Sequence, residues 1–319
     1  MAEIVLFGEP MAMFVADSVG PLDKVNKFTR SLAGSEVNVA IGLRRLGHSV
    51  LYVSRLGNDP FGKYIENCLQ NEGIEIRCTY DTEHATGFQL KSKVNSGDPE
   101  VYYFRSNSAA TYLTGRDVDS TDFSGTRFLH LTGIFPALSQ SCRNAAYRLI
   151  ERAHENAIPI SFDPNLRPGL WKSSKVMVSI LNDMISRCDF VLPGIEEGEI
   201  LTGCKDPKGI AEYYLSRGVK MVTVKLGSHG SYTQTKDKSF FQSCVGVNKI
   251  VDTVGAGDGF AVGIISGILE GLDLYQAVKR GNAIGALQLM VRGDNEGLPT
   301  KEKLEDFMRS SHDETTAGD

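Results

Sequence analysis

Short apolar runs alternate with amphipathic stretches along most of this chain, and the alternation limits the folds that are open to it. Runs typical of buried strands stand at Ile4–Gly8, Arg127–Gly133, Ile158–Phe162 and Met221–Lys225, while Gly34–Gly47 has the period of a helix. Strands that alternate with helices favour a mostly parallel sheet with helices on both faces. We therefore predict an α/β fold, a three-layer α/β/α sandwich.

Two regions break this alternation. Met11–Arg30 has no helical period and fits a pair of strands. Thr86–Val94 is separated by the turn Asn95–Pro99 from the aromatic run Val101–Arg105, which predicts a hairpin. We expect these stretches to form a small β-strand lid that projects from the main body. An exposed lid strand can pair with a second subunit, so a homo-oligomer through the lid is a further expectation.

No internal repeat or long linker divides the chain. We expect one domain over residues 1–309, with lid segments inserted at about 11–33 and 85–108. Its last helix is expected to end near Arg309. Ser310–Asp319 is polar and is predicted to be a disordered tail.

Charge and cysteine usage narrow the class of partner. A formal net charge of −5 gives no basic field for nucleic acid or for an anionic membrane. The 6 cysteines form no C-x-x-C pair and the 6 histidines no metal-ligand cluster, so a structural zinc is not expected. The chain opens without the basic and apolar segments of a secretory signal. We expect a cytoplasmic protein that binds small molecules, with no nucleic-acid or membrane partner.

The stretch Asp252–Gly267 carries the strongest chemical signal, because a glycine-rich turn runs straight into an apolar, helix-like segment. The first N–H groups of a helix are unpaired and lie at its positive end, so Gly255, Ala256 and Gly257 offer backbone donors to an anion. Asp258 follows, where a carboxylate could take a proton from an incoming hydroxyl. The pattern suggests phosphoryl transfer. The alternative is a tight strand-to-helix connection with Asp258 as a cap.

Two common nucleotide signatures do not fit. The G-x-G-x-x-G fingerprint fails because Phe260 stands where a third glycine belongs, which disfavours a nicotinamide oxidoreductase. Gly57–Lys63 has the glycine and lysine spacing of a P-loop, but Tyr64 replaces the hydroxyl residue that would hold magnesium. We interpret that segment as a surface turn in which Asn58 and Asp59 precede a helix.

Three motifs together identify a family resemblance: Gly34-Ser-Glu-Val-Asn38, Arg55-Leu-Gly57-x-Asp59-x-Phe-Gly62 and Asp252-Thr-Val-Gly-Ala-Gly-Asp258. Through them the chain resembles the ribokinase-like (PfkB-type) carbohydrate kinases over nearly its full length. Within that family it is most similar to 2-keto-3-deoxygluconate kinases, on the segments Tyr102–Ala110, Asp163–Pro168 and Arg292–Pro299. Fructokinases share part of the pattern. The resemblance implies ATP-dependent phosphorylation of a sugar acid, with Mg2+ and, optionally, a monovalent cation as cofactors.

The resemblance also implies a role for particular residues. Asp258 is similar to the catalytic base, and Gly255, Ala256 and Gly257 to the anion hole. Where many members have an Asn-x-x-Glu motif that organises magnesium through water, this chain has Gly194 and Glu197, so only the glutamate matches. The implied substrate contacts are Gly34, Asn38, Tyr103, Arg105, Arg167, Asp258 and Asp294. The implied ATP contacts are Asn165, Lys225, Gly227, Ser228, Gly230, Gly255, Gly257 and Asn282.

Several of these roles have alternatives. Tyr103 suits strand packing whatever it binds, and Asn38 suits helix capping. Arg167 could serve a nucleotide phosphate, and Asp294 a turn or an arginine partner. The two arginines, Arg105 and Arg167, favour an acid substrate, because a guanidinium fork holds a carboxylate with two charge-assisted bonds. Fructokinase is the alternative function. A sugar-binding regulator is disfavoured because the aspartate and its glycines are intact.

Overall fold

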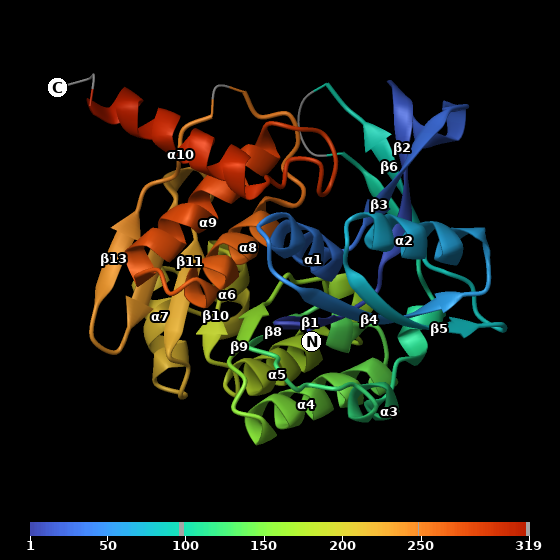
Figure 1. Cartoon of the computed structure of the whole chain (residues 1–319), viewed down its shortest axis with the longest axis horizontal. Coiled ribbons are helices and arrows are strands. Elements are labelled where there is room, and N and C mark those ends of the chain that lie inside the picture. The colour runs from blue at the N-terminus through green and yellow to red at the C-terminus, as the bar shows by residue number, and fades with distance from the viewer. Residues whose placement is uncertain (96–98, 248, 317–319) are drawn as a thin grey trace.

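The main sheet lies at the centre of the computed structural model, which describes residues 1–95, 99–247 and 249–316 (Figure 1). Within these residues, nine strands form it. In order across the sheet they are β13 (Ser239–Gln242), β12 (Ser231–Thr235), β11 (Met221–Lys225), β10 (Phe190–Val191), β9 (Ile160–Asp163), β8 (Phe128–Thr132), β1 (Ile4–Phe7), β4 (Val50–Gly57) and β5 (Glu75–Asp81).

The strands from β11 to β5 pair in parallel, and β12 and β13 add an antiparallel edge. The carboxyl ends of parallel strands lie along the same edge of the sheet, and ligands bind at this edge in open α/β folds. Thr132 and Asp163 are register partners at the ends of β8 and β9, and Lys225 ends β11. The sheet therefore presents these polar side chains along the same edge.

Helices cover both faces of the sheet (Figure 1). Val5 and Phe7 of β1 pack on one side and Ile4 and Leu6 on the other, as the two-residue period of a strand requires. The first face holds α3 (Gly115–Asp119), α4 (Gln140–Glu155), α5 (Ser174–Ile185), α6 (Ile195–Thr202) and α7 (Pro207–Leu215). The second holds α1 (Ser35–Arg45), α2 (Pro60–Asn71), α8 (Ala256–Leu269), α9 (Leu274–Leu289) and α10 (Lys301–Thr316). Among the described residues, none of these helices has the length and apolar character needed to cross a bilayer.

A second, smaller sheet contains the strands that the sequence assigns to a lid. Its order is β3 (Phe28–Ala33), β2 (Met11–Val19), β6 (Phe88–Lys93) and β7 (Val101–Phe104). The predicted hairpin is confirmed, because β6 and β7 pair antiparallel. Residues 96–98 of its predicted turn lie outside the described part of the chain. Association of subunits through this sheet stays a prediction.

The stretch that resembles a P-loop is a helix cap, as predicted. Asp59 precedes α2, and its Oδ1 accepts the N–H groups of Phe61 and Gly62 at 2.9 and 2.8 Å. Its Oδ2 accepts the N–H of Thr86 at 2.7 Å. Oδ1 therefore caps the start of the helix, and Oδ2 binds the backbone of the segment before β6.

Helix α8 packs with almost no space around its small residues. A Cβ atom on Gly263 would lie 2.4 Å from Cα of Gly281 in α9, and one on Gly42 in α1 would lie 2.6 Å from a Val262 methyl. The apolar glycine-rich sequence after Asp258 is thus what lets three helices approach one another closely.

Two predictions about helices were wrong. The last helix does not end near Arg309, because α10 continues to Thr316; residues 317–319 lie outside the described part. Polar composition suggested a disordered tail from Ser310, but an established helix adds polar residues at little cost. Helix α7 was not predicted, although Asp206 caps it and Pro207 stands at its first position.

Candidate active site

A cavity of about 310 Å3 lies where the small sheet faces the carboxyl ends of β9 and β11 and the first turns of α1 and α8. Segments far apart in the sequence meet here. The predicted site residues that line it are Gly34, Asn38, Tyr103, Arg105, Asn165, Arg167, Glu197, Lys225, Gly255, Gly257, Asp258 and Asp294. The predicted residues outside its lining are Ala256, Gly227, Ser228, Gly230 and Asn282.

Asp258 lies in the first turn of α8 and is buried. Ser35 Oγ donates to its Oδ1 at 2.5 Å, and Asn38 Nδ2 donates to its Oδ2 at 2.8 Å. Burial raises the pKa of Asp258 to about 7, against the lowering effect of these two hydrogen bonds and of Lys225. A carboxyl group with such a pKa can exchange a proton near neutral pH.

The glycine turn before Asp258 is constrained at Gly255, whose φ of 81° is left-handed. A Cβ there would also lie 2.2 Å from the carbonyl oxygen of Asp294, so only glycine fits. Gly257 differs, since it lies inside α8 and its φ is not positive. A Cβ on Gly257 would point at Lys225 Nζ, 3.4 Å away. The left-handed residue of this turn is therefore Gly255 and not Gly257.

Lys225 brings a positive charge to the cavity beside this turn. Its Nζ lies 2.7 Å from Oδ2 of Asp163. Burial acts against the ammonium charge, but Asp163, Glu197 and Asp258 outweigh it and raise the pKa of Lys225 above its usual value. Asn165 lies nearby with a positive φ of 38° and donates from Nδ2 to Ser35 Oγ at 2.8 Å. The hydrogen-bond chain thus continues from Asp258 through the serine to Asn165.

Arg105 does not present a free guanidinium, although motif matching assigns it to the substrate. Its Nε and Nη2 lie 2.7 and 2.5 Å from Oε2 of Glu9, a residue that is 2% exposed. The other Glu9 oxygen accepts the hydroxyl of Ser108. The expected fork for a substrate carboxylate is therefore largely used by a buried protein carboxylate, which needs a cation to offset its desolvation.

Arg167 is the arginine whose charge is available. It is half-buried, lines the cavity and donates from Nη1 to the carbonyl of Leu166 at 2.9 Å. No acidic side chain in the described part of the chain forms an ion pair with it. Tyr103 also lines the cavity and is 45% exposed, with Arg105 Cζ 5.6 Å from its ring centre. A large exposed ring at a cavity wall is open to contact with a ligand.

Glu197 lines the cavity, but both of its oxygens already accept backbone groups. Oε1 accepts the N–H of Leu166 and Oε2 that of Gly194, each at 2.8 Å. In the described part of the chain, no three or more His, Cys, Asp or Glu side chains are grouped so that they could hold a metal ion. Glu197 thus fixes the loop that carries Arg167 and is not one ligand of a protein metal cage.

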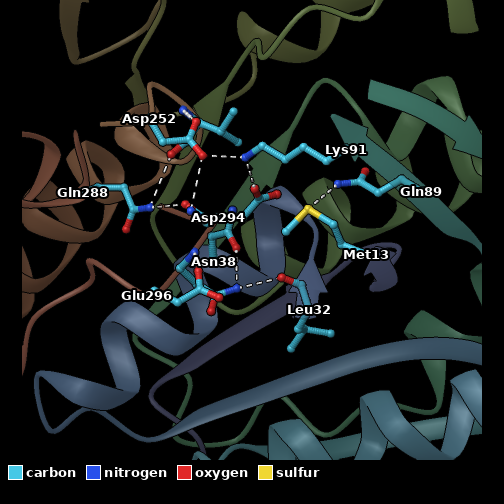
Figure 2. A network of polar contacts seen from close by, with 12 residues as sticks. Met13, Leu32, Asn38, Gln89, Lys91, Asp252, Gln288, Asp294 and Glu296 are labelled. Atoms are coloured by element: carbon cyan, nitrogen blue, oxygen red, sulfur yellow. Dashed lines mark hydrogen bonds and ion pairs between the residues drawn. The ribbon is translucent and has the colours of Figure 1, made fainter. Parts of the chain in front are cut away.

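Asp294 pairs with a lysine of the small sheet, whereas the sequence predicted a substrate contact, with a turn or an arginine partner as the alternative. Lys91 Nζ lies 3.1 Å from its Oδ1 and 2.7 Å from Oδ2 of Asp252 (Figure 2). Asn295, the next residue, donates from Nδ2 to Leu32 O at 3.0 Å and to Asn38 Oδ1 at 3.3 Å. The loop after α9 is therefore bound to the small sheet and to α1.

Two of the residues outside the cavity lining, Asn282 and Gly230, contact β12 and β13. Asn282 of α9 donates to Ser231 Oγ and Gln242 O, both at 3.3 Å. A Cβ on Gly230, whose φ is 87°, would lie 2.1 Å from that same carbonyl oxygen. These contacts account for Asn282 and Gly230 by packing, and the assignment of this region to a nucleotide stays a prediction.

The architecture and this cavity can now be set beside known proteins. A family model described as pfkB family carbohydrate kinase matches residues 1–301. This chain belongs to that family. The kinase is 48% identical over 308 residues to the 2-dehydro-3-deoxygluconokinase of Bacillus subtilis (strain 168). The alignment covers 96% of this chain and 95% of that relative.

Two solved structures confirm the predicted ribokinase-like fold of the kinase. A PfkB protein from Polaromonas sp. JS666 superposes with a TM-score of 0.88 at 42% identity, over 96% of this chain and 99% of that one. An E. coli protein with the provisional name Ribokinase II, in complex with ATP and Mg2+, has a TM-score of 0.90 at 26% identity, over 97% and 100% of the two chains.

Sequence reasoning missed two charged residues of this carbohydrate kinase, Glu9 and Lys91. Glu9 gives no local signal, because a lone glutamate after a strand is ordinarily exposed. Lys91 does give one. On β6 the polar Gln89 and Lys91 are buried while Phe88 and Leu90 are only half-buried, so the polar face of the strand turns inward. Alternation with a buried polar face indicates a strand that borders a polar site.

Arg105→Ala should destabilise the kinase because it leaves the Glu9 carboxylate buried without its cation. We expect the free energy of unfolding in urea to fall by about 3–5 kcal/mol. The matched control is Arg167→Ala, which removes an arginine without an ion pair and should change the unfolding free energy by less than about 1 kcal/mol. Wild-type stability of Arg105→Ala, together with lost sugar affinity, would return Arg105 to the substrate-binding role implied by the sequence.

Proposed function

We propose that this carbohydrate kinase transfers the γ-phosphoryl group of ATP to the 6-hydroxyl of 2-keto-3-deoxygluconate. The hydroxyl oxygen attacks the γ-phosphorus in line with the bond to the leaving ADP oxygen, and that bond breaks as the new one forms. The hydroxyl proton passes to Asp258. The observation that carries the proposal is a buried carboxyl group with a pKa of about 7 beside a backbone turn suited to an anion.

Three features support Asp258 as the base. Its two oxygens are oriented by Ser35 and Asn38, so the side chain has one position in the cavity. Its raised pKa brings its basicity close to the working pH, where a general base is most effective. It also belongs to the first turn of α8, beside the N–H groups that would receive the phosphoryl oxygens. Asn38 acts in this proposal by positioning Asp258.

The anion hole is proposed to form at the turn Gly255-Ala256-Gly257. Such donors stabilise the charge that gathers on the transferring group when they are already in position before the reaction. Gly257 leaves room beside Lys225, so the lysine ammonium and the backbone donors approach the same space. Lys225 is then proposed to neutralise phosphoryl charge together with these N–H groups.

ATP is proposed as the phosphoryl donor, with support from the E. coli structure that contains ATP and Mg2+. Magnesium would offset the charge of the phosphates. Glu197 would act on it only through water, since backbone groups occupy both its oxygens. Asn165 lines the cavity near Asp258 and is proposed to contact the phosphates. The proposed contacts to the rest of the nucleotide are Gly227, Ser228, Gly230 and Asn282.

The sugar acid is proposed on the similarity to the B. subtilis kinase and on Arg167. A guanidinium without a protein carboxylate partner, at the wall of the cavity, suits a substrate carboxylate. Gly34, Tyr103 and Asp294 complete the proposed sugar contacts.

Fructokinase is kept as a second candidate because of one observation. Arg105 is paired with Glu9, so one of the two cations that favour an acid substrate is already neutralised.

Asp258→Asn should remove the proton acceptor while preserving the size of the side chain, although only one of the two oxygens that accept from Ser35 and Asn38 is kept. We expect kcat to fall roughly 10²–10⁴-fold, with the KM values for sugar and ATP within a few-fold, because a general base acts mainly in the transition state. Coupled ADP-release kinetics would measure this, with Asp17→Asn on the small sheet as a matched control. Retention of more than about a tenth of kcat by well-folded mutant protein would exclude the role.

The pH dependence of wild-type kcat/KM tests the same residue in another way. The base must be ionised to accept a proton, and a pKa of about 7 makes the protonated form dominant at lower pH. Each unit below pH 7 should therefore lower kcat/KM about tenfold. An aspartate with the ordinary pKa of 3.8 would leave the profile flat down to about pH 5. A flat profile would contradict the assignment.

Arg167→Ala decides the substrate class. If Arg167 binds the carboxylate, kcat/KM for 2-keto-3-deoxygluconate should fall at least about 30-fold, while any residual activity on fructose changes much less. A raised KM for ATP would assign the arginine to the nucleotide. If wild-type enzyme phosphorylates fructose more efficiently than the keto acid, the fructokinase alternative replaces the sugar-acid proposal.

A further inference from the structure

Lys91 is a buried lysine that links the small sheet to the glycine turn. It is 2% exposed, and its Nζ lies between two carboxylates, 2.7 Å from Asp252 Oδ2 and 3.1 Å from Asp294 Oδ1 (Figure 2). The two aspartates are themselves buried, at 8% and 5% exposure. One cation is thus shared by two desolvated acids that come from separate loops.

Both aspartates hold the turn that leads into α8. Asp252 Oδ1 accepts the N–H of Val254 at 3.2 Å, and its Oδ2 accepts that of Gly293 at 3.3 Å. The Asp294 carbonyl lies against Gly255, where no Cβ would fit. A shift of either aspartate would therefore move the left-handed residue that begins the helix.

Gln288 of α9 closes the frame around the turn. Its Nε2 donates to the carbonyls of Gly293 and Val254 at 2.7 and 3.3 Å, and its Oε1 accepts the N–H of Gly297 at 3.0 Å. Neutral hydrogen bonds of this kind set the backbone path but leave the charges of Asp252 and Asp294 uncompensated. In the part of the chain that the structure describes, both acids form an ion pair with Lys91.

We propose that Lys91 is a positioning residue for phosphoryl transfer, which pairs with both Asp252 and Asp294 and thereby keeps the Gly255 turn in its anion-binding conformation. The inference rests on the proposed function of that turn as the anion hole. Lys91 has a second effect on the same step. Two uncompensated carboxylates beside the turn would repel the incoming phosphates, and the ammonium offsets one of their two negative charges.

The titration of the pair agrees with this geometry. Burial raises the pKa of Asp294, and the Lys91 charge opposes the rise. Burial also disfavours the Lys91 charge, but Asp294 and Asp252 more than compensate and raise the pKa of the lysine. Without the lysine, burial would raise the pKa of Asp294 further, or the two side chains would move apart. Either change alters the turn.

Lys91→Met tests the proposal in the full-length enzyme, because methionine keeps the length and loses the charge. We expect kcat to fall at least about tenfold per folded enzyme, since displaced anion-hole donors act in the transition state. The KM for the sugar should rise by a smaller factor than kcat falls, because the short contacts of Nζ go to protein carboxylates and only one of these, Asp294, is a proposed sugar contact. The matched control is Lys93→Met on the same strand, whose Nζ binds the Asp17 carbonyl instead. It should leave both constants within about twofold.

A double variant keeps the test open if Lys91→Met folds poorly. Lys91→Met/Asp294→Asn removes the cation together with one acid. Its kcat should be at least about threefold higher than that of Lys91→Met, because the effects of substitutions at residues in contact are not additive. Wild-type kcat in Lys91→Met, or a double variant no better than the single one, would overturn the positioning role. So would a large rise in sugar KM at unchanged kcat, which would make Lys91 a substrate ligand.

The test is independent of which sugar the enzyme uses. The ratio of mutant to wild-type kcat is measured with the best substrate of the wild-type protein, whether keto acid or fructose. If fructose is preferred, the substrate proposal fails while the Lys91 ratio still decides its own question. If Asp258→Asn and Lys91→Met are both fully active, the assigned transfer site is wrong as well.

Discussion

The burial of the Asp258 carboxylate between two helix starts is the constraint on which the site depends. An ionised carboxylate is costly to remove from water unless donors replace its hydration. Here Ser35 and Asn38, both from the first turns of α1, supply the donors, while the start of α8 supplies the favourable end of a helix dipole. Helices α1 and α8 must therefore lie side by side with their N-termini level. Gly42 makes that approach possible, because a larger residue would collide with Val262.

Charge pairing organises the rest of the cavity. Asp163 is paired with Lys225, Glu9 with Arg105, and Asp252 and Asp294 share Lys91. A site that receives a polyanionic nucleotide is thus rich in carboxylates, and each paired acid has its cation supplied by another segment of the chain. Such pairs contribute little net stability when both partners are buried, but breaking one leaves an uncompensated charge. They are therefore better understood as devices that hold loops in register, and Arg167 is the basic residue left over for a ligand.

The fold and the centre of the site were predictable from sequence because both have local signals. The spacing of apolar residues predicted most strands and helices, and the glycine turn before Asp258 predicted the start of α8. The charge pairs had no such signal, since Arg105 and Glu9 are 96 residues apart and Lys91 and Asp294 are 203 apart. Motif matching placed Arg105, Asn38 and Asp294 at the cavity correctly, but could not tell a side chain that faces a ligand from one committed to a neighbour. The end of α10 was misjudged for the opposite reason, because polarity is compatible with both a helix and a disordered tail.

The same electrostatics connect the two halves of the proposed mechanism. Asp258 must be ionised before it can accept a proton, yet burial and the nearby Asp163 already raise its pKa, with only Lys225 and two hydrogen bonds opposing them. Bound phosphates would add negative charge and raise the pKa further. Cations that bind with the nucleotide or already lie in the site must offset this rise in pKa if Asp258 is to act as a base at neutral pH. Lys225 faces Gly257 and Asp163 together, so in the proposed mechanism its one ammonium group would attract the phosphoryl group and also lower the pKa of Asp258. Phosphoryl binding and proton removal therefore draw on the same positive charge, and a change to Lys225 would affect both at once.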